Sequence, residues 1–179
     1  MKRIILITGG QRSGKSRKAE ELALNLSDNP VYVATAHIWD EEFLDRGHKH
    51  QERRGPQWTN IEEEIYLSRH ELTGRVVVID CVTLWLTNFI SLTSNSSLHD
   101  EGNFNVDRIL AAAKKEFDAF TSPDATYIFV TNEIGCGGVS ENALQRRFTD
   151  LQGWMNQYIA QQADEVILMV SGIELKVKG

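Results

Sequence analysis

Five short apolar runs are spaced along the chain and predict its architecture. Each run has four to six residues, is rich in large apolar side chains, and lacks a clean alternation between apolar and polar positions. Short continuous runs are typical of strands that are buried on both faces, as in a parallel sheet covered by helices. We therefore predict an α/β fold with a mainly parallel sheet. The runs are Ile4 to Thr8, Val31 to Thr35, Val76 to Asp80, Tyr127 to Thr131 and Val166 to Val170.

Longer segments with helical spacing separate these runs. Apolar residues recur every three or four positions within 19–26, 109–120 and 144–159, which is the spacing of an amphipathic helix. After Ser171 and Gly172, the segment Ile173 to Val177 alternates apolar and charged residues and predicts an edge strand in a hairpin with the fifth run. The alternation of strands and helices predicts one open α/β domain over residues 1–179, with a polar surface loop over 93–105.

Composition excludes several classes of protein. With 19 Lys and Arg against 25 Asp and Glu, the net charge is -6, so we expect no general attraction to nucleic acid or anionic membrane. No apolar run approaches the roughly 20 residues of a membrane span, and the first run is too short for a signal peptide. We expect a cytoplasmic protein.

The chain has two cysteines, Cys81 and Cys136. Two are too few for a disulfide framework or a four-cysteine zinc site, so we expect both cysteines to be small semi-buried residues.

A glycine-rich stretch after the first run fits the phosphate-loop pattern G-x-x-x-x-G-K-[ST]. Glycines let backbone N–H groups converge on phosphate oxygens, and the helix that follows adds the positive end of its dipole. In this pattern Lys15 reaches the β- and γ-phosphates and the Ser16 hydroxyl ligates Mg²⁺. The strand–loop–helix context predicts a nucleoside triphosphate site. The stretch reads Gly9–Gly10–Gln11–Arg12–Ser13–Gly14–Lys15–Ser16.

The third apolar run ends in an acidic residue, Asp80. An acid at this place can reach the Mg²⁺ beside a phosphate loop, although Asp at a strand end is often a cap for the next element. Because a phosphate loop is present, we favour the metal role. Open parallel sheets bind ligands outside the carboxyl ends of their strands. We therefore expect one sheet edge to carry the loop Gly9 to Ser16, Thr35, Asp80 and Glu133.

Residues 45–54 are locally basic in an acidic chain. They carry four Lys or Arg, two acids and two histidines. If the segment is helical, His50, Arg53 and Arg54 share a face, whereas His48 points elsewhere. From the residues alone two interpretations stay open. The segment is either a solvated charged helix, or a phosphate subsite in which an imidazole beside two guanidinium groups acts as a nucleophile.

The segment after the fourth run is rich in glycine and reads Glu133–Ile134–Gly135–Cys136–Gly137–Gly138. Such glycines indicate close backbone approach to a ligand or a hinged lid, or else a simple flexible turn. Two further residues are candidates for ligand contact. His37 lies just past the second run, where ligand contacts cluster, and Trp58 can stack on a purine, although tryptophan more often packs in a core.

Motifs spread over nearly all 179 residues follow the order of one known family. They are Gly9 to Ser16, Val33–Ala34–Thr35–Ala36, His50–Gln51–Glu52–Arg53–Arg54 with Trp58 and Glu62, Asp80–Cys81–Val82–Thr83 with Thr87–Asn88, Thr131–Asn132–Glu133–Ile134–Gly135–Cys136–Gly137, Glu141–Asn142, and Ala163–Asp164–Glu165–Val166 with Gly172–Ile173. The chain resembles the bifunctional adenosylcobinamide kinase/adenosylcobinamide-phosphate guanylyltransferase family of cobalamin biosynthesis. The His-x-x-Arg-Arg and Thr-Asn-Glu-Ile-Gly motifs are more specific than the phosphate loop.

The resemblance implies two reactions. The first phosphorylates the aminopropanol hydroxyl of adenosylcobinamide with a nucleoside triphosphate, GTP or ATP. The second transfers GMP from GTP to adenosylcobinamide phosphate through a GMP-histidine intermediate, giving adenosylcobinamide-GDP and pyrophosphate. The resemblance places the guanylylated residue at His50 and a catalytic role at Lys15, which overturns the charged-helix interpretation. It also implies Mg²⁺, a RecA-like phosphate-loop domain, and a homo-oligomer that is commonly a trimer.

The family's binding positions carry over residue by residue. The nucleotide-binding set is Gly9, Gly10, Gln11, Arg12, Ser13, Gly14, Lys15, Ser16, Thr35, Ala36, His37, Gln51, Glu52, Arg53, Arg54, Glu62 and Thr83, and the metal set is Ser16 and Asp80. The chain departs from the family in two places. His48 is a second histidine two residues before His50, and Ser140 stands where the family usually has proline.

Three other classes of protein compete with this interpretation. A monofunctional phosphate-loop kinase acting on a small molecule leaves His50, Arg53 and Arg54 without a role. A nucleotide-sensing module would bind without chemistry. A GTPase switch is disfavoured, because the sequence has no Asn-Lys-x-Asp motif for reading guanine.

Overall fold

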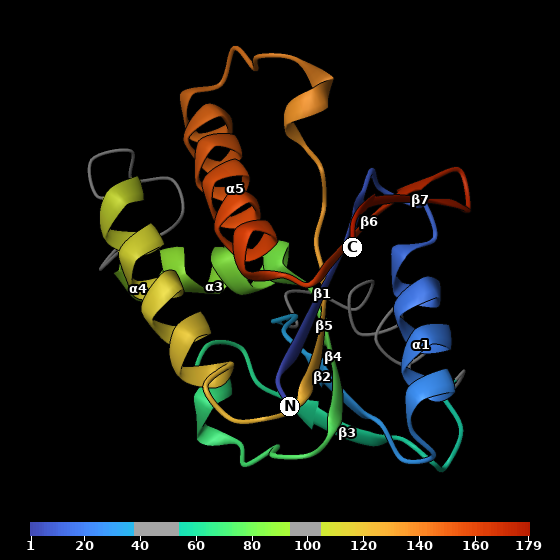
Figure 1. The fold of residues 1–179 in the computed structure, drawn as a ribbon. Helices are drawn as coiled ribbons and strands as arrows, with labels where there is room; N and C mark the ends of the chain where they lie inside the picture. The colour runs from blue at the N-terminus through green and yellow to red at the C-terminus, as the bar shows by residue number, and fades with distance from the viewer. Residues whose placement is uncertain (38–53, 94–104) are drawn as a thin grey trace.

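The protein is described from a computed structural model, which describes residues 1–37, 54–93 and 105–179 (Figure 1). Within these ranges seven strands form one sheet of order β3-β2-β4-β5-β1-β6-β7. Every pairing is parallel except that of β6 with β7, which confirms the predicted sheet and C-terminal hairpin. The strands are β1 (Arg3–Gly9), β2 (Val31–Ala34), β3 (Thr59–Glu62), β4 (Val76–Asp80), β5 (Thr126–Val130), β6 (Glu165–Val170) and β7 (Ile173–Lys178).

Helices cover both faces of the sheet. Helix α1 (Lys15–Leu26) lies on one face, and α3 (Val82–Thr93), α4 (Val106–Phe120) and α5 (Ala143–Gln162) lie on the other (Figure 1). Two short 3₁₀ turns, η1 (Leu67–Arg69) and η2 (Gly135–Gly137), complete the described elements. The three helices that apolar spacing predicted are therefore confirmed. No helix within the described ranges is long and apolar enough to cross a bilayer.

Two elements were not predicted. Helix α3 buries five large apolar residues at the i, i+3, i+4, i+7 and i+8 spacing of an amphipathic helix, Val82, Trp85, Leu86, Phe89 and Ile90, so its sequence carried a helical signal that was missed. Strand β3 is an edge strand, and its sequence Thr-Asn-Ile-Glu is largely exposed. Neither the continuous nor the alternating apolar pattern that marks a strand is present there.

Alternate residues of the central strands fill two separate cores. Ile4 and Leu6 of β1 belong to the core beneath α3, α4 and α5. Ile5 and Ile7 belong to the core beneath α1. Since side chains alternate across a strand, a strand with helices on both faces must be apolar at every position. The continuous apolar runs of the sequence have this cause.

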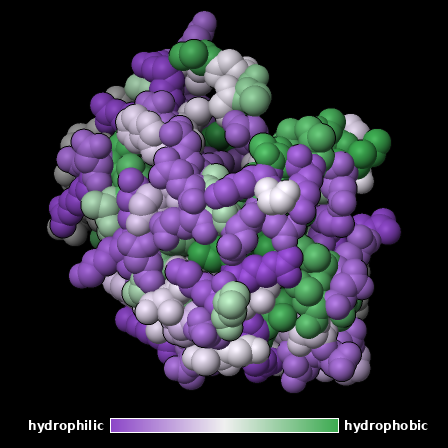
Figure 2. Space-filling view, in the orientation of Figure 1, coloured by the Kyte–Doolittle hydropathy of each residue, from purple (hydrophilic) through white to green (hydrophobic). Residues whose placement is uncertain are grey.

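The C-terminal hairpin is the exposed end of the sheet. Every residue of β7 is exposed, and Figure 2 shows apolar side chains gathered over the β6–β7 hairpin. They include Ile173, Leu175 and Val177. The charged residues of β7 tie the hairpin back to the fold. Lys18 of α1 pairs with Glu174, and Lys178 Nζ donates to the Ala160 carbonyl at 3.0 Å.

Phe117 provides a test of the core beneath α3, α4 and α5. Its ring is fully buried and lies 5.1 Å from the Phe129 ring and 5.8 Å from the Tyr158 ring. We expect Phe117→Ala to lower the free energy of unfolding by about 3–5 kcal/mol, as measured by urea denaturation. The control Leu24→Ala, on the exposed side of α1, should cost less than about 1 kcal/mol. Equal losses would contradict the packing described here.

Candidate active site

The phosphate loop is shaped by a close backbone contact. Gly9 ends β1 with φ of 151°, and a Cβ at this position would lie 2.4 Å from the Met169 carbonyl oxygen of β6 and 2.8 Å from Ser13 Oγ. Gly14 precedes α1 in a left-handed conformation with φ of 96°. A side chain at Gly9 would therefore push the loop away from the sheet, so the pattern requires glycine there for packing as well as for phosphate approach.

Two other segments hold the loop in place. The turn of the β6–β7 hairpin donates the Gly172 N–H to the Ser13 carbonyl at 2.9 Å, and the Glu133 N–H donates to the Gly9 carbonyl at 3.0 Å. Glu133 thus lies beside the phosphate loop at the carboxyl edge, as predicted. Its carboxylate accepts the Gly135 N–H at 2.9 Å, which orders the start of the glycine-rich segment as a turn.

Lys15 extends into the loop that precedes it. The side chain is nearly buried, with 7% of the residue exposed, and Nζ donates to the Gly10 carbonyl at 2.6 Å. Burial lowers the pKa of the Lys15 ammonium, while the negative charge of nearby Asp80 acts in the opposite direction. The ammonium is thus held between the loop backbone and the end of β4, where it can pair with the β- and γ-phosphates of a nucleotide.

Asp80 lies at the carboxyl end of β4 and accepts a hydrogen bond from a neighbouring strand. Tyr32 of β2 donates its hydroxyl to Asp80 Oδ2 at 2.7 Å. The register pairs Ala34 with Asp80, so Tyr32 reaches its acceptor diagonally, two residues back on the same face. Burial and the adjacent carboxylate raise the pKa of Tyr32 well above its usual value. The phenol therefore stays protonated and acts as the donor.

Arg54 is packed against this tyrosine. Its guanidinium carbon lies 3.6 Å from the centre of the Tyr32 ring, and its side chain is 5% exposed. Nε donates to Asn60 Oδ1 of β3 at 2.9 Å, and Nη1 lies 3.7 Å from Glu20 Oε1 of α1. Arg54 thus joins α1, β2 and β3 from beneath the site, rather than projecting into the phosphate loop.

The donor set at the edge fits Mg²⁺ bound with a nucleotide. Mg²⁺ usually takes one or two protein oxygens and completes an octahedron with phosphate oxygens and waters. The Asp80 carboxylate and the Ser16 hydroxyl provide oxygens of this kind. Among the described residues there is no group of three or more His, Cys, Asp and Glu that could hold a metal alone, so an ion here would depend on the phosphates.

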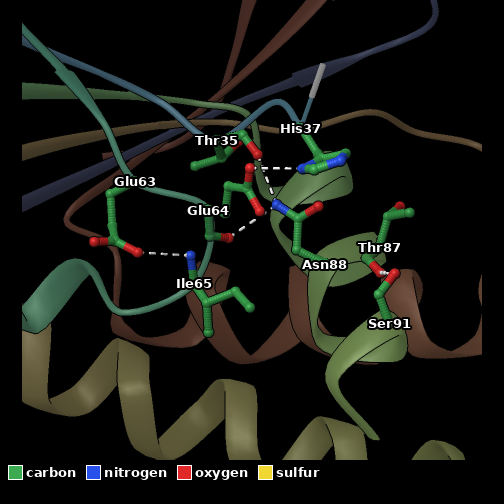
Figure 3. Close-up of polar contacts among 8 residues, drawn as sticks. All are labelled: Thr35, His37, Glu63, Glu64, Ile65, Thr87, Asn88 and Ser91. Carbon is green, nitrogen blue, oxygen red and sulfur yellow. Dashed lines mark hydrogen bonds and ion pairs between the residues drawn. The ribbon is translucent and has the colours of Figure 1, made fainter. Parts of the chain in front are cut away.

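A second cluster of polar contacts lies at the ends of β2 and β3 (Figure 3). The fully buried Thr35 hydroxyl donates to the Cys81 carbonyl and accepts the Cys81 N–H, both at 2.8 Å. Asn88 of α3 donates its Nδ2 to the Thr35 and Glu64 carbonyls at 2.7 and 2.9 Å. His37 Nδ1 lies 2.7 Å from Glu64 Oε1. The carboxylate therefore orients an imidazole at the rim of the site.

A third cluster continues along the end of β5. Asn132 donates its N–H and its Nδ2 to Thr83 Oγ1 at 3.2 and 3.0 Å. The buried Thr131 hydroxyl donates to Asn156 Oδ1 of α5 and accepts Gln152 Nε2, each at 2.7 Å. These bonds fix the start of the Thr-Asn-Glu-Ile-Gly motif to α3 and α5.

A cavity of about 440 Å³ opens next to this third cluster. It lies between α3, the segment that leads into α5, and the first turns of α5. Thr87 lines it and is one helical turn beyond Thr83, to whose carbonyl its hydroxyl donates at 3.0 Å. The lining mixes apolar and polar side chains, namely Thr87, Ile90, Ser140, Asn142, Leu144, Gln145 and Phe148.

The structure brings most of the predicted site residues together. The phosphate loop, Thr35 to His37, Asp80, Thr83 and Glu133 lie along the carboxyl edge. Glu62 ends β3 at that edge and is exposed. His48, His50, Gln51, Glu52 and Arg53 lie outside the described residues, as does most of the predicted loop over 93–105.

Other residues were misjudged or missed. The expectation of two semi-buried cysteines is wrong for Cys136, which is exposed, and right for Cys81, which is buried. Burial raises the pKa of the Cys81 thiol to about 12, so it packs as a neutral group. Sequence reasoning missed Tyr32 and Glu64, and it noted Asn88 only as part of a family motif. The position of Tyr32, on the same strand face as Ala34, offered a signal for its role.

Comparisons with known proteins agree in their result. Residues 5–177 match the family model described as cobinamide kinase / cobinamide phosphate guanyltransferase. The chain is 37% identical to the bifunctional adenosylcobalamin biosynthesis protein CobU of Escherichia coli K12, over 98% of this chain and 99% of that protein. It is 35% identical to the bifunctional adenosylcobalamin biosynthesis protein CobP of Pseudomonas aeruginosa, over 97% and 96%. A solved ATPase of the type III secretion system of pathogenic bacteria has a similar fold, with a TM-score of 0.52 at 11% identity, covering 93% of this chain and 50% of that one.

The two glycines of the loop offer a matched pair of variants. A Cβ at Gly9 meets the Met169 carbonyl, whereas a Cβ at Gly10 meets nothing within 4 Å. We expect Gly9→Ala to lower the thermal unfolding midpoint and to weaken GTP binding by about tenfold or more, from strain of roughly 1–3 kcal/mol. Gly10→Ala should keep the wild-type midpoint. Calorimetry measures both quantities, and equal midpoints for the two variants would contradict the close contact.

Proposed function

The chain belongs to the cobinamide kinase / cobinamide phosphate guanyltransferase family, and we propose that both activities use nucleotide bound at the carboxyl edge around Lys15 and Asp80. It is a bifunctional transferase of cobalamin biosynthesis. The observation that carries the proposal is the Lys15 ammonium held inside the phosphate loop, at 2.6 Å from the Gly10 carbonyl, with the Asp80 carboxylate nearby. Relatives that are 34–37% identical over nearly their whole length are named bifunctional adenosylcobalamin biosynthesis proteins, and the description of the family model states the two roles.

In the kinase step, the hydroxyl of adenosylcobinamide attacks the γ-phosphorus of GTP or ATP. A new O–P bond forms, the bond to the β-phosphate oxygen breaks, and the nucleoside diphosphate leaves. Lys15 and the loop N–H groups hold the phosphates in line and stabilise the charge of the transferring group. Bound Mg²⁺ would neutralise charge on the β- and γ-oxygens, and Ser16 and Asp80 would hold it. His37, oriented by Glu64, lies at the rim of the same edge.

In the guanylyl step, the nucleophile is the imidazole of His50. It attacks the α-phosphorus of GTP and releases pyrophosphate, and the phosphate of adenosylcobinamide phosphate then displaces histidine and takes the GMP. Arg54 supports this assignment, because it lies four residues after His50 in the sequence and packs on Tyr32, which donates a hydrogen bond to Asp80. Arg53 supplies a further cation for the phosphates.

The acceptor has a candidate site in the cavity beside α3. The cavity lies one helical turn beyond Thr83, which follows Asp80 by three residues, so a substrate lodged there can direct its hydroxyl to the phosphates. Adenosylcobinamide carries an apolar ring system with amide side chains, and the cavity of about 440 Å³ offers both kinds of surface to one edge of that molecule. Ile90 and Phe148 would pack against the ring, while Thr87 and Gln145 would hydrogen-bond with amides.

The setting of the reaction follows from the same assignments. We propose Mg²⁺ as the metal, because the available ligands are hard oxygens. We propose the cytoplasm as the site of action, since the reaction consumes nucleoside triphosphates. We also propose a homotrimer, because the family that the chain resembles commonly forms one.

A kinase without the second activity would leave His50 and Arg53 unused, and a sensor without chemistry would leave Lys15 and Asp80 unused.

Labelled GTP separates the two half-reactions. After incubation with GTP and Mg²⁺ alone, we expect an acid-labile, base-stable label on the protein from α-labelled GTP and none from γ-labelled GTP. His50→Ala should lose the label and the guanylyl transfer yet keep kinase activity, whereas His48→Ala should keep the label. Lys15→Ala should lose phosphorylation, because its charge is missing from the transferring group. A label that survives in His50→Ala would overturn the nucleophile.

A pair of tryptophan variants tests the acceptor cavity. Gln145→Trp places a large ring at the cavity and should raise the KM for adenosylcobinamide at least about tenfold, while the KM for GTP stays within about twofold. Gln157→Trp, also exposed on α5 but away from the cavity, should leave both constants near wild type. Equal KM values for adenosylcobinamide in the two variants would place the acceptor elsewhere.

A further inference from the structure

We propose that Tyr32 is a positioning residue for Asp80, and that Arg54 supports Tyr32 in this role by stacking on its ring. The proposal rests on the metal role of Asp80 proposed above. It goes further because it assigns a role in metal binding to a tyrosine outside the phosphate loop and outside the family motifs, and it gives Arg54 a task other than holding phosphate.

The first contact fixes the orientation of the carboxylate. Tyr32 donates to Asp80 Oδ2 at 2.7 Å, so this oxygen is held toward β2. The bond restricts rotation of the carboxylate, and Oδ1 takes no part in it. A ligand whose rotamer is locked in advance loses less freedom when the ion arrives, which is why partners of metal ligands commonly change metal affinity.

A phenol suits this position better than a cation would. A lysine or arginine on Oδ2 would pair with the carboxylate and compete with a divalent ion for its charge. Tyr32 supplies the hydrogen bond without any charge. The cation that belongs to this site, Lys15, approaches from the phosphate loop, where it faces the nucleotide. Asp80 is therefore held from one direction by a neutral donor and keeps its negative charge for the ion.

The second contact is the stack of Arg54 on the tyrosine ring. Its guanidinium lies 3.6 Å from the ring centre, and Trp58 meets the same ring edge-on at 6.0 Å. A cation over a phenol withdraws electron density from it and makes the hydroxyl a stronger donor. Arg54 is held in this place by Asn60 of β3, whose Oδ1 accepts its Nε at 2.9 Å. The stack on Tyr32 is therefore fixed by a second element.

Metal binding can be measured without turnover. Mn²⁺ in place of Mg²⁺, with a non-hydrolysable GTP analogue, gives a dissociation constant from the electron paramagnetic resonance signal of the free ion. We expect Tyr32→Phe to raise this constant about tenfold. Phenylalanine keeps the ring beneath Arg54 and beside Trp58, so the fold is retained. Arg54→Met should raise the constant about threefold through the weakened stack. The matched control Tyr127→Phe removes a hydroxyl that donates to the Pro123 carbonyl at 3.0 Å, at the other end of the sheet, and should change nothing.

A double-mutant cycle distinguishes positioning from a general structural effect. In an Asp80→Asn background, Tyr32→Phe should cause no further loss of Mn²⁺ affinity, because the carboxylate that it positions is gone. The role of Tyr32 would be overturned by the same loss of Mn²⁺ affinity in both backgrounds, or by wild-type affinity in Tyr32→Phe. Wild-type affinity in Arg54→Met would overturn the contribution of the Arg54 stack. If Asp80→Asn itself binds Mn²⁺ as wild type does, the proposed metal site fails instead.

Discussion

The parallel alignment of β1, β2, β4 and β5 is the constraint on which the site depends. Because these strands run in the same direction and in a fixed register, their last residues come to one edge. The phosphate loop, Thr35, Asp80 and Thr131 meet there although as many as 122 positions separate them along the chain, from Gly9 to Thr131. Strand β5 pairs with both β1 and β4. The loop and the metal carboxylate are therefore held a strand apart, with room for phosphates between them.

Buried polar side chains convert this alignment into a rigid edge. The Thr35 hydroxyl makes hydrogen bonds with both the N–H and the carbonyl of Cys81. Asn88 donates to the carbonyls of Thr35 and Glu64, which follow β2 and β3. Gln152 of α5 donates to the hydroxyl of Thr131, which follows β5. Such groups are costly to bury unless they are paired. Their presence beneath the site therefore indicates that its loops are held in defined positions rather than left to arrange around a ligand.

Much of this arrangement was predictable, and the limits have physical causes. Continuous apolar runs identified the buried strands, and the glycine pattern identified the phosphate loop, because each reports a local requirement. The edge strand β3 escaped because it has no contrast between apolar and polar faces, whereas helix α3 has the apolar spacing of an amphipathic helix and was predictable. Tyr32 escaped because its partner, Asp80, is distant in sequence. Asn88 was noted only as part of a family motif, because the Thr35 and Glu64 carbonyl groups that it binds are also distant. The family resemblance includes Arg54 among the nucleotide-binding residues, and the structure packs its guanidinium on the Tyr32 ring.

The contact between Gly172 and Ser13 has a consequence for the order in which the protein acquires its binding site. A chain emerging from the ribosome presents Ser13 long before Gly172, because 159 positions separate the phosphate loop from the hairpin turn that holds it. Strand β1 also lacks its neighbour β6 until then. The nascent protein therefore has the glycine-rich sequence before it has the backbone contacts that shape the loop for phosphates.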